Sequence, residues 1–313
     1  MPAAVQACLG LSSLAYEWNE LDTARRSAQQ AFELGHRWGN PNTLAGVHLM
    51  RARLEQAEGD SIGASEALHE AKELARGQGV TLPTAHQVDA FHVRLLLAQD
   101  NLEAARRWSR EKALNLDDEI SYSQQIAYMT LARILVFENR AETALILLER
   151  ILVQVEAIGQ MGRALEVLIL QSLALADLGD TPRALSVLGR ALTLGQPEGY
   201  VRVFLDEGAR MAKLLRHAGS HGVSPKYVAK LLSLFDREIG ITPAMQQPLI
   251  EPLTERELDV LRLLADGLSN QAIADRLVVA LGTIKAHTAS LYRKLDVISR
   301  TQAVARAREL GLL

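Results

Sequence analysis

The stretch NRAETA, residues 139–144, has four counterparts along the chain, and together they decide the fold. The counterparts are NELDTA at 19–24, GDSIGA at 59–64, QDNLEA at 99–104 and GDTPRA at 179–184. The five segments align without gaps, and neighbouring segments are always 40 residues apart. A fixed period of this length is typical of proteins built from stacked supersecondary units.

Each repeated segment has the composition of a tight turn followed by the start of a helix. In four of the five segments the second residue is acidic, and a carboxylate there can accept hydrogen bonds from the free N–H groups of the next helix. Each segment ends on alanine, whose small side chain lets two antiparallel helices approach closely. These alanines are Ala24, Ala64, Ala104, Ala144 and Ala184.

Apolar residues recur at helical spacing after the turns, as in Ala144, Leu147, Leu148 and Ile151. Each unit is therefore predicted to be a helical hairpin that obtains a core only by stacking on its neighbours. The predicted fold of residues 1–197 is an all-α, TPR-like solenoid. Its period is longer than that of a tetratricopeptide repeat, which is about 34 residues. Two interpretations stay open. One is a solenoid without a fixed ligand, and the other is a solenoid whose concave face binds an effector or partner.

The composition argues against several classes of protein. The chain has 313 residues, a net charge of −3 and a single cysteine, Cys8, which cannot form a disulfide framework or a thiolate metal cluster. It has no leader-like N-terminus and no apolar window of about 18 residues, so we expect a cytoplasmic chain without membrane contact. His217 and His221 have the spacing of metal ligands, but nearby glycines and the lack of a third ligand argue against a metal site. No catalytic arrangement stands out.

The repeat pattern ends after residue 196. Residues 198–250 are predicted to form connecting helices and a linker, because Pro243, Pro248 and Pro252 fall within ten residues and cannot lie inside a helix. Residues 251–313 are then predicted to form a separate C-terminal domain.

The C-terminal domain is predicted to contain four helices, and a short turn joins the second to the third. In the third helix, 282–295, the residues Ile284, Leu291 and Leu295 are spaced to face inward. The opposite side of that helix holds Gly282, Lys285, Ala286, Ala289 and Arg293. Such a face is small at its centre and positive at its edges, which suits the major groove of DNA. Charge alone would still favour a solvated face on a small bundle.

A resemblance to a known family goes further than charge. The segments LTERELDVLRLLADGLSNQAIADRL, TIKAH, KLDV and SRTQAV, within 253–304, follow the pattern of the LuxR-type DNA-binding domain in order and spacing. Details such as Ile284 and Tyr292 are most similar to the MalT-like branch, whose members carry helix-pair repeats before that domain. The resemblance implies a transcription regulator that binds double-stranded DNA as a homodimer. It also implies RNA polymerase as a further partner and an unidentified small-molecule or protein effector on the repeats.

The resemblance also implies roles for individual residues. The base-facing residues would be Lys285, Ala286 and Ala289. The residues near the DNA backbone would be Ser269, Asn270, Thr283, Arg293, Lys294, Arg300, Thr301 and Gln302. The dimer face would include Val304 and Ala307 on the fourth helix. Because alanine cannot hydrogen-bond to a base through its side chain, we expect DNA shape and half-site spacing to carry more of the specificity.

MalT-like regulators also have an ATP-binding module with a phosphate-binding loop. The pattern G-x-x-x-x-G-K-[ST] occurs nowhere in the 313 residues, so we expect no ATP or other cofactor on this chain. We expect either a fragment of a longer regulator or a natural short form. The alternative function is an α-solenoid interaction scaffold that does not bind DNA and whose C-terminal bundle only caps the repeats.

Overall fold

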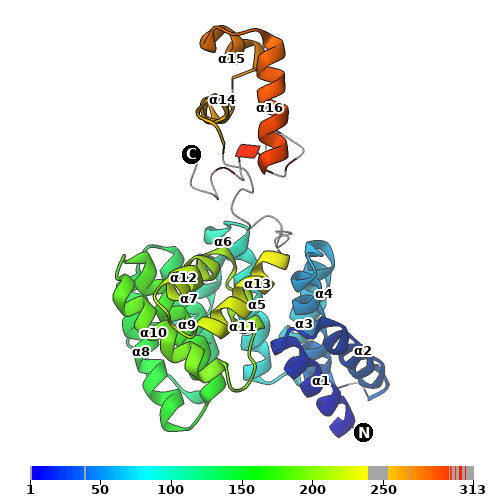
Figure 1. Ribbon diagram of the computed structural model, residues 1–313. Helices are drawn as coiled ribbons and strands as arrows, with labels where there is room; N and C mark the ends of the chain where they lie inside the picture. Colours follow the sequence, from blue (N-terminus) through cyan, green and yellow to red (C-terminus); the bar gives the residue numbers. More distant parts are fainter. Residues whose placement is uncertain are drawn as a thin grey trace. The chain divides into compact units, whose positions relative to one another are not determined.

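The computed structural model describes residues 2–38, 40–238, 253–266, 268–295, 297, 300, 303–304 and 307. The chain divides into two compact units, Met1–Phe235 and Asp236–Leu313, called here the repeat body and the C-terminal body (Figure 1). Every regular element among the described residues is helical. The predicted all-α fold is therefore confirmed.

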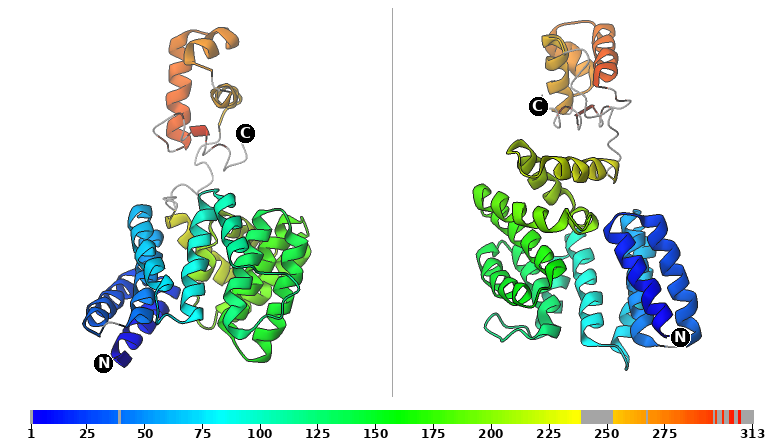
Figure 2. Two further views of the ribbon diagram at one scale, coloured as in Figure 1. Left: turned by 180° about the vertical axis from the view of Figure 1, so that it is seen from behind. Right: turned by 60° about the horizontal axis from the view of Figure 1, so that its bottom comes forward.

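The repeat body begins with five helical hairpins, one for each repeated segment. The hairpins are α1 (Pro2–Glu17) with α2 (Leu21–Trp38), α3 (Pro41–Ala57) with α4 (Ser61–Arg76), α5 (Leu82–Ala98) with α6 (Leu102–Glu111), α7 (Gln125–Phe137) with α8 (Ala141–Ala157), and α9 (Met161–Asp177) with α10 (Thr181–Gly195). A short 3₁₀ turn, η1 (Tyr122–Gln124), precedes α7. Figure 2 shows these hairpins side by side in chain order.

The turn inside each hairpin depends on one residue with a left-handed backbone. Gly59 and Gly179 have φ of 85° and 76°, and Asn19 and Asn139 have φ of 62° and 59°. Glycine and asparagine are the residues that adopt this conformation at least cost. In the second and fifth repeats the following aspartate caps the next helix, because Asp60 accepts a hydrogen bond from the Gly63 N–H at 2.9 Å and Asp180 accepts one from the Arg183 N–H at 3.2 Å.

The third repeat is displaced by one residue relative to the gap-free alignment. Its left-handed residue is Asp100, with φ of 56°, and the capping side chain is Asn101, which accepts from the Ala104 N–H at 3.2 Å. The alanine fully buried between the helices is consequently Ala105, whereas Ala104 is only half-buried. The prediction of Ala104 for this position was wrong by one residue. In the other repeats the predicted alanines are fully buried, namely Ala24, Ala64, Ala144 and Ala184.

Three further helices complete the repeat body: α11 (Arg202–Leu205), α12 (Gly208–Ser220) and α13 (Pro225–Glu238). Phe204, Leu215 and Leu231 are fully buried in the same core as α7 to α10. Residues 198–235 thus pack with the repeats, and the sequence boundary at residue 197 does not separate two bodies. The prolines predicted to form the linker, at 243, 248 and 252, lie outside the described residues.

Residues 198–207, called here the return segment, come back from the last repeat to the first (Figure 1). The Val201 N–H donates to the Glu17 carbonyl at 2.7 Å, and the Trp18 indole N–H donates to the Glu198 carbonyl at 2.9 Å. The partners in these bonds are far apart in the sequence. Trp18 and Glu198, for example, are separated by 180 residues. The return segment therefore ties the two ends of the repeat array together.

The C-terminal body contains α14 (Glu255–Ala265), α15 (Asn270–Leu277) and α16 (Leu281–Leu295), and residues 300, 303, 304 and 307 are also helical. A capping box begins α14, since the Glu257 N–H donates to the Thr254 hydroxyl and the Thr254 N–H donates to the Glu257 carboxylate. Buried contacts between Val260, Ile273 and Ile284 hold the three helices together. In the described part of the chain, no helix has the length and apolar character needed to cross a membrane.

Candidate nucleic-acid interface and ligand pocket

Helix α16 has one buried and one exposed face. Ile284 and Leu291 are completely buried, and Leu295 is nearly so, as the spacing predicted. The exposed residues include the three that were predicted to face bases, together with three of their neighbours. They are Lys285, Ala286 and Ala289, with Gly282, Thr283 and Arg293. The helix has no acidic residue, so this whole face is neutral or positive.

Two of the predicted backbone contacts lie at the start of α15. Ser269 is exposed and caps the helix, and its hydroxyl accepts a hydrogen bond from the Ala272 N–H at 3.2 Å. Asn270 is half-buried in the first turn. A helix N-terminus presents free N–H groups and partial positive charge, which suits a phosphate.

Three other predicted site residues make contacts inside the C-terminal body. The Lys294 ammonium lies 2.8 Å from the Glu257 carboxylate, and its side chain is only 10% exposed. The Arg300 guanidinium donates to the carbonyls of Leu264 and Leu268 at 2.6 and 2.7 Å, so it caps the end of α14. Ala307 is fully buried in the core instead of lying on an open dimer face. Val304 is half-buried, and Thr301 and Gln302 lie outside the described residues.

Glu257 fixes the orientation of α16 against α14. Besides Lys294, its buried carboxylate accepts hydrogen bonds at 2.8 Å from the Ser290 hydroxyl and from the Thr254 N–H. Burial by itself would raise the pKa of this carboxyl, but the hydrogen bonds from Lys294, Thr254 and Ser290 outweigh burial and lower the pKa to about 2. The spacing of Thr254 and Glu257 in the sequence can indicate a capping box, but it does not reveal the contacts of Glu257 with α16.

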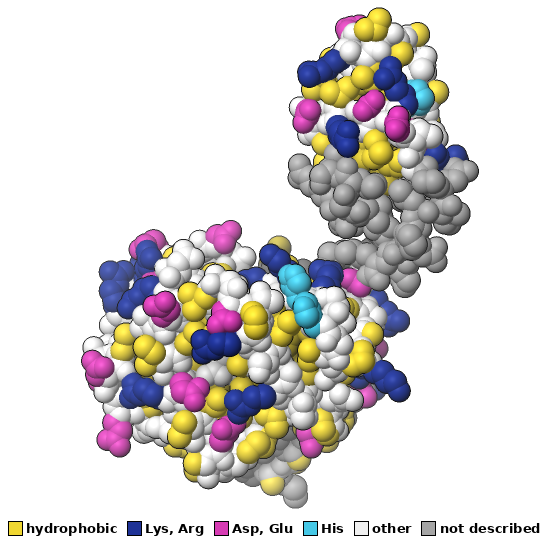
Figure 3. Space-filling view, turned by 60° about the vertical axis from the view of Figure 1, so that its left-hand side comes forward, with side chains coloured by type: hydrophobic (Ala, Val, Ile, Leu, Met, Phe, Trp, Pro, Cys, Tyr) yellow, Lys and Arg dark blue, Asp and Glu magenta, His cyan; other side chains and the backbone are white. Residues whose placement is uncertain are grey.

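The repeat body contains a pocket of about 260 Å³ that is partly open to solvent. Its walls come from the first helices of all five hairpins and from α11 of the return segment. Three arginines stand at equivalent places in successive repeats and form what we call the arginine row: Arg53, Arg94 and Arg133. Their intervals of 41 and 39 residues match the one-residue displacement of the third repeat. By contrast, on the surface of the repeat body that Figure 3 shows, Lys and Arg side chains are interspersed with Asp and Glu side chains and do not gather in one patch.

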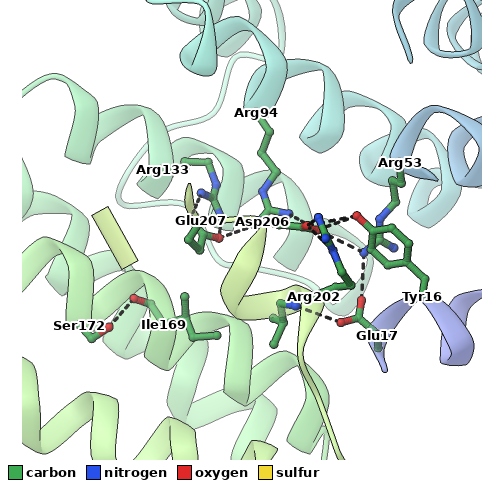
Figure 4. Close-up of polar contacts among 11 residues, drawn as sticks. Tyr16, Glu17, Arg53, Arg94, Arg133, Ile169, Ser172, Arg202, Asp206 and Glu207 are labelled. Carbon is green, nitrogen blue, oxygen red and sulfur yellow. Dashed lines mark hydrogen bonds and ion pairs between the residues drawn. The ribbon is translucent and has the colours of Figure 1, made fainter. Parts of the chain in front are cut away.

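The return segment places two acidic side chains against the arginine row (Figure 4). Glu207 is bound by Arg133 through two hydrogen bonds of 2.6 and 2.7 Å, and Arg94 donates to the same carboxylate. Burial would raise the pKa of Glu207, but the charges of Arg133 and Arg94 outweigh it and lower the pKa to about 2. Asp206 accepts from Arg202 at 2.6 Å and from the Tyr16 hydroxyl at 3.0 Å.

Comparison with known proteins gives matches over both bodies. The family model described as the MalT-like TPR region matches residues 1–221. The chain belongs to the MalT-like TPR family. The model described as bacterial regulatory proteins, luxR family, matches residues 251–307, so this MalT-like chain also carries a LuxR-type domain.

Individual MalT proteins are similar to this MalT-like chain along most of its length. The HTH-type transcriptional regulator MalT of Vibrio cholerae is 26% identical over 314 residues, covering 94% of this chain and 34% of that protein. The protein of the same name from Yersinia pestis strain Pestoides F is 26% identical over 321 residues, covering 96% of this chain and 35% of that protein. The chain thus spans about a third of the length of these relatives.

One turn of the MalT-like chain's LuxR-type domain is strained. Val278, which ends α15, has φ of 55° and ψ of 50° and is 89% exposed. A β-branched residue is poorly suited to this left-handed conformation, which costs about 1–3 kcal/mol, whereas glycine adopts it freely. We expect Val278→Gly to raise the free energy of unfolding of the C-terminal body by about 1 kcal/mol. Urea denaturation followed by circular dichroism measures this change.

The matched control for Val278→Gly is Ala289→Gly, at an exposed position in the middle of α16. Glycine in a helix interior costs about 1 kcal/mol relative to alanine, so this variant should be less stable than the parent. If both variants lose stability, the left-handed turn at Val278 is not a source of strain.

Proposed function

We propose that this chain is a DNA-binding transcription regulator in which α16 enters the major groove of double-stranded DNA. The observation that carries the proposal is the exposed face of α16, where Lys285, Ala286 and Ala289 lie together while Ile284 and Leu291 hold the opposite face in the core. The match to the luxR family over residues 251–307 supports the same function.

The chemistry of this face suits a groove lined by phosphates. Ala286 and Ala289 add little bulk at the centre of the helix, so the backbone can approach the base edges closely. Lys285 can donate to a guanine or offset a phosphate charge, and no carboxylate on α16 opposes either contact. Ser269 and Thr283, both exposed, are retained as proposed phosphate contacts, and Arg293 as a proposed contact at the far end of the helix.

The proposal has two further parts. The chain acts as a homodimer on DNA, with Val304 as a candidate for the contact between copies. The repeat body binds an effector that controls DNA binding or assembly, and the pocket of about 260 Å³ is the place for it. The position of the pocket, between both ends of the repeat array, supports this assignment, because a ligand there would change how tightly the array closes.

The first test is the effect of Lys285→Ala on DNA binding by the whole chain. Binding sites would be selected from a random pool, and affinity would be measured by fluorescence anisotropy over a range of salt concentrations. If Lys285 reads a base, the variant should lose about 1–3 kcal/mol of binding free energy. If it contacts a phosphate, the slope of log affinity against log salt should become shallower by about one.

The control for Lys285→Ala is Lys226→Ala, which removes an exposed lysine from the repeat body and should leave DNA affinity unchanged. Absent or salt-independent DNA binding by the parent chain would contradict the proposal and favour an interaction scaffold.

A further inference from the structure

The pocket of the repeat body contains two charged residues that form no direct ion pair with the described residues. Seven charged residues line it: Arg53, Arg94, Arg133, Arg163, Glu17, Glu166 and Asp206. Five of them are engaged within the body, since Arg53 pairs with Glu17, Arg94 and Arg133 bind Glu207, and Asp206 binds Arg202. Arg163 and Glu166 make no hydrogen bond or ion pair with any residue that the structure describes.

Arg163 and Glu166 lie one helical turn apart on α9. Side chains three residues apart on a helix are neighbours, with about 5–6 Å between their Cβ atoms. Arg163 is half-buried and Glu166 is more exposed. The wall of the pocket therefore offers a cation and an anion side by side, both available to a ligand.

The rest of the lining is largely apolar. It includes Phe91 from α5, Ile126 and Met129 from α7 and Leu170 from α9. Pockets for drug-sized ligands have volumes of about 300–1,000 Å³, and this pocket, at about 260 Å³, suits a smaller molecule. The occupant should then be small and partly apolar, and it should carry a negative and a positive group close to each other.

We propose that the pocket binds a free apolar α-amino acid. Its carboxylate pairs with Arg163, its ammonium group pairs with Glu166, and its side chain packs among Phe91, Ile126 and Met129. A simple anion would face the Glu166 carboxylate, which interacts with Arg94 only at longer range because Arg94 is bound to Glu207, and a simple cation would face Arg163, so each fits the pair less well than a zwitterion does. This inference rests on the proposed effector role of the repeat body and names the class of effector.

The test is calorimetric titration of the full chain, without DNA, with leucine, isoleucine, methionine and phenylalanine. At least one should bind saturably. Leucine analogues then separate the two contacts, since N-acetyl-leucine lacks the ammonium group and leucinamide lacks the carboxylate. Because each removes a charge-assisted contact, each analogue should bind about tenfold more weakly than the free amino acid.

Two variants assign the contacts to residues. Glu166→Gln should bind leucine about tenfold more weakly but distinguish it little from N-acetyl-leucine. Arg163→Met should likewise bind leucine more weakly but distinguish it little from leucinamide. Arg183→Met, at an exposed residue of α10 outside the pocket, should behave as the parent. Absence of saturable binding, equal binding of the analogues by the parent, or unchanged affinity in both pocket variants would overturn the inference.

The outcome is separable from that of the DNA-binding test. Amino-acid binding without DNA binding would support the pocket assignment and contradict the regulator. DNA binding without amino-acid binding would leave the regulator standing and overturn the assignment of this effector class.

Discussion

Replacing Glu207 with alanine should lower the free energy of unfolding of the repeat body by about 3–5 kcal/mol. The Glu207 side chain is 5% exposed and neutralises Arg94 and Arg133 from successive repeats. Its removal leaves the guanidinium of Arg133 buried without the carboxylate that it binds through two hydrogen bonds. An uncompensated buried charge is among the most destabilising changes that one substitution can make.

The pH dependence of this effect has a definite sign. The folded-state pKa of Glu207 is lowered from 4.5 to about 2, so its contribution is complete above the ordinary value and is lost as pH falls from about 4.5 toward 2. The difference in stability between the parent chain and Glu207→Ala should therefore be largest at neutral pH and shrink through that window. Urea denaturation at a series of pH values, followed by circular dichroism, measures it.

The control is Glu156→Ala, which removes an acid whose pair with Arg190 is largely exposed on the same body. Exposed ion pairs contribute about 0–1 kcal/mol, so this variant should stay close to the parent. Equal losses in the two variants would show that the arginine row does not depend on Glu207.

The sequence predicted the repeat body well because its physics is local and repetitive. Each hairpin needs a left-handed turn, a cap and a small residue, and all three lie within six letters such as GDTPRA at 179–184. The prediction was wrong at Ala104 because the gap-free alignment concealed a one-residue displacement. A search for glycine or asparagine, which adopt a left-handed backbone at least cost, would not have revealed this displacement. The left-handed residue of the third repeat is an aspartate, Asp100.

The polar interior of the repeat body was not predicted, because its partners are far apart in sequence. Arg94 and Glu207 are separated by 113 residues, and Tyr16 and Asp206 by 190. One local signal did exist, since arginine recurs at nearly the repeat period in Arg53, Arg94 and Arg133. The return segment has no such period, so its Asp206 and Glu207 could not be paired with these arginines from sequence alone.

Within the C-terminal body, helical periodicity placed the exposed face of α16 correctly but could not tell which cations face solvent. Lys285 and Lys294 differ by nine residues, and only the position of Glu257 on another helix draws Lys294 inward. The same holds for Arg300, which is bound by backbone carbonyls that no side-chain pattern reveals.

Replacing Glu257 with alanine should destabilise the C-terminal body by about 3 kcal/mol and weaken DNA binding, although Glu257 is not a proposed DNA contact. The substitution leaves the Lys294 ammonium, 10% exposed, without its carboxylate and removes the hydrogen bond that holds Ser290. Helix α16 then loses the polar anchor that sets its orientation against α14. Denaturation of the C-terminal body and anisotropy on the selected DNA measure the two effects.

The control for Glu257→Ala is Glu255→Ala, which removes an exposed acid from the same first turn of α14. Both acids favour the helix N-terminus electrostatically, so any difference between the variants reports the contacts of Glu257 with α16. Because the folded-state pKa of Glu257 is lowered from 4.5 to about 2, its contribution is present above 4.5 and lost as pH falls toward 2. The stability gap between the variants should close over that range, and a gap that persisted at pH 2 would mean that packing rather than charge anchors α16.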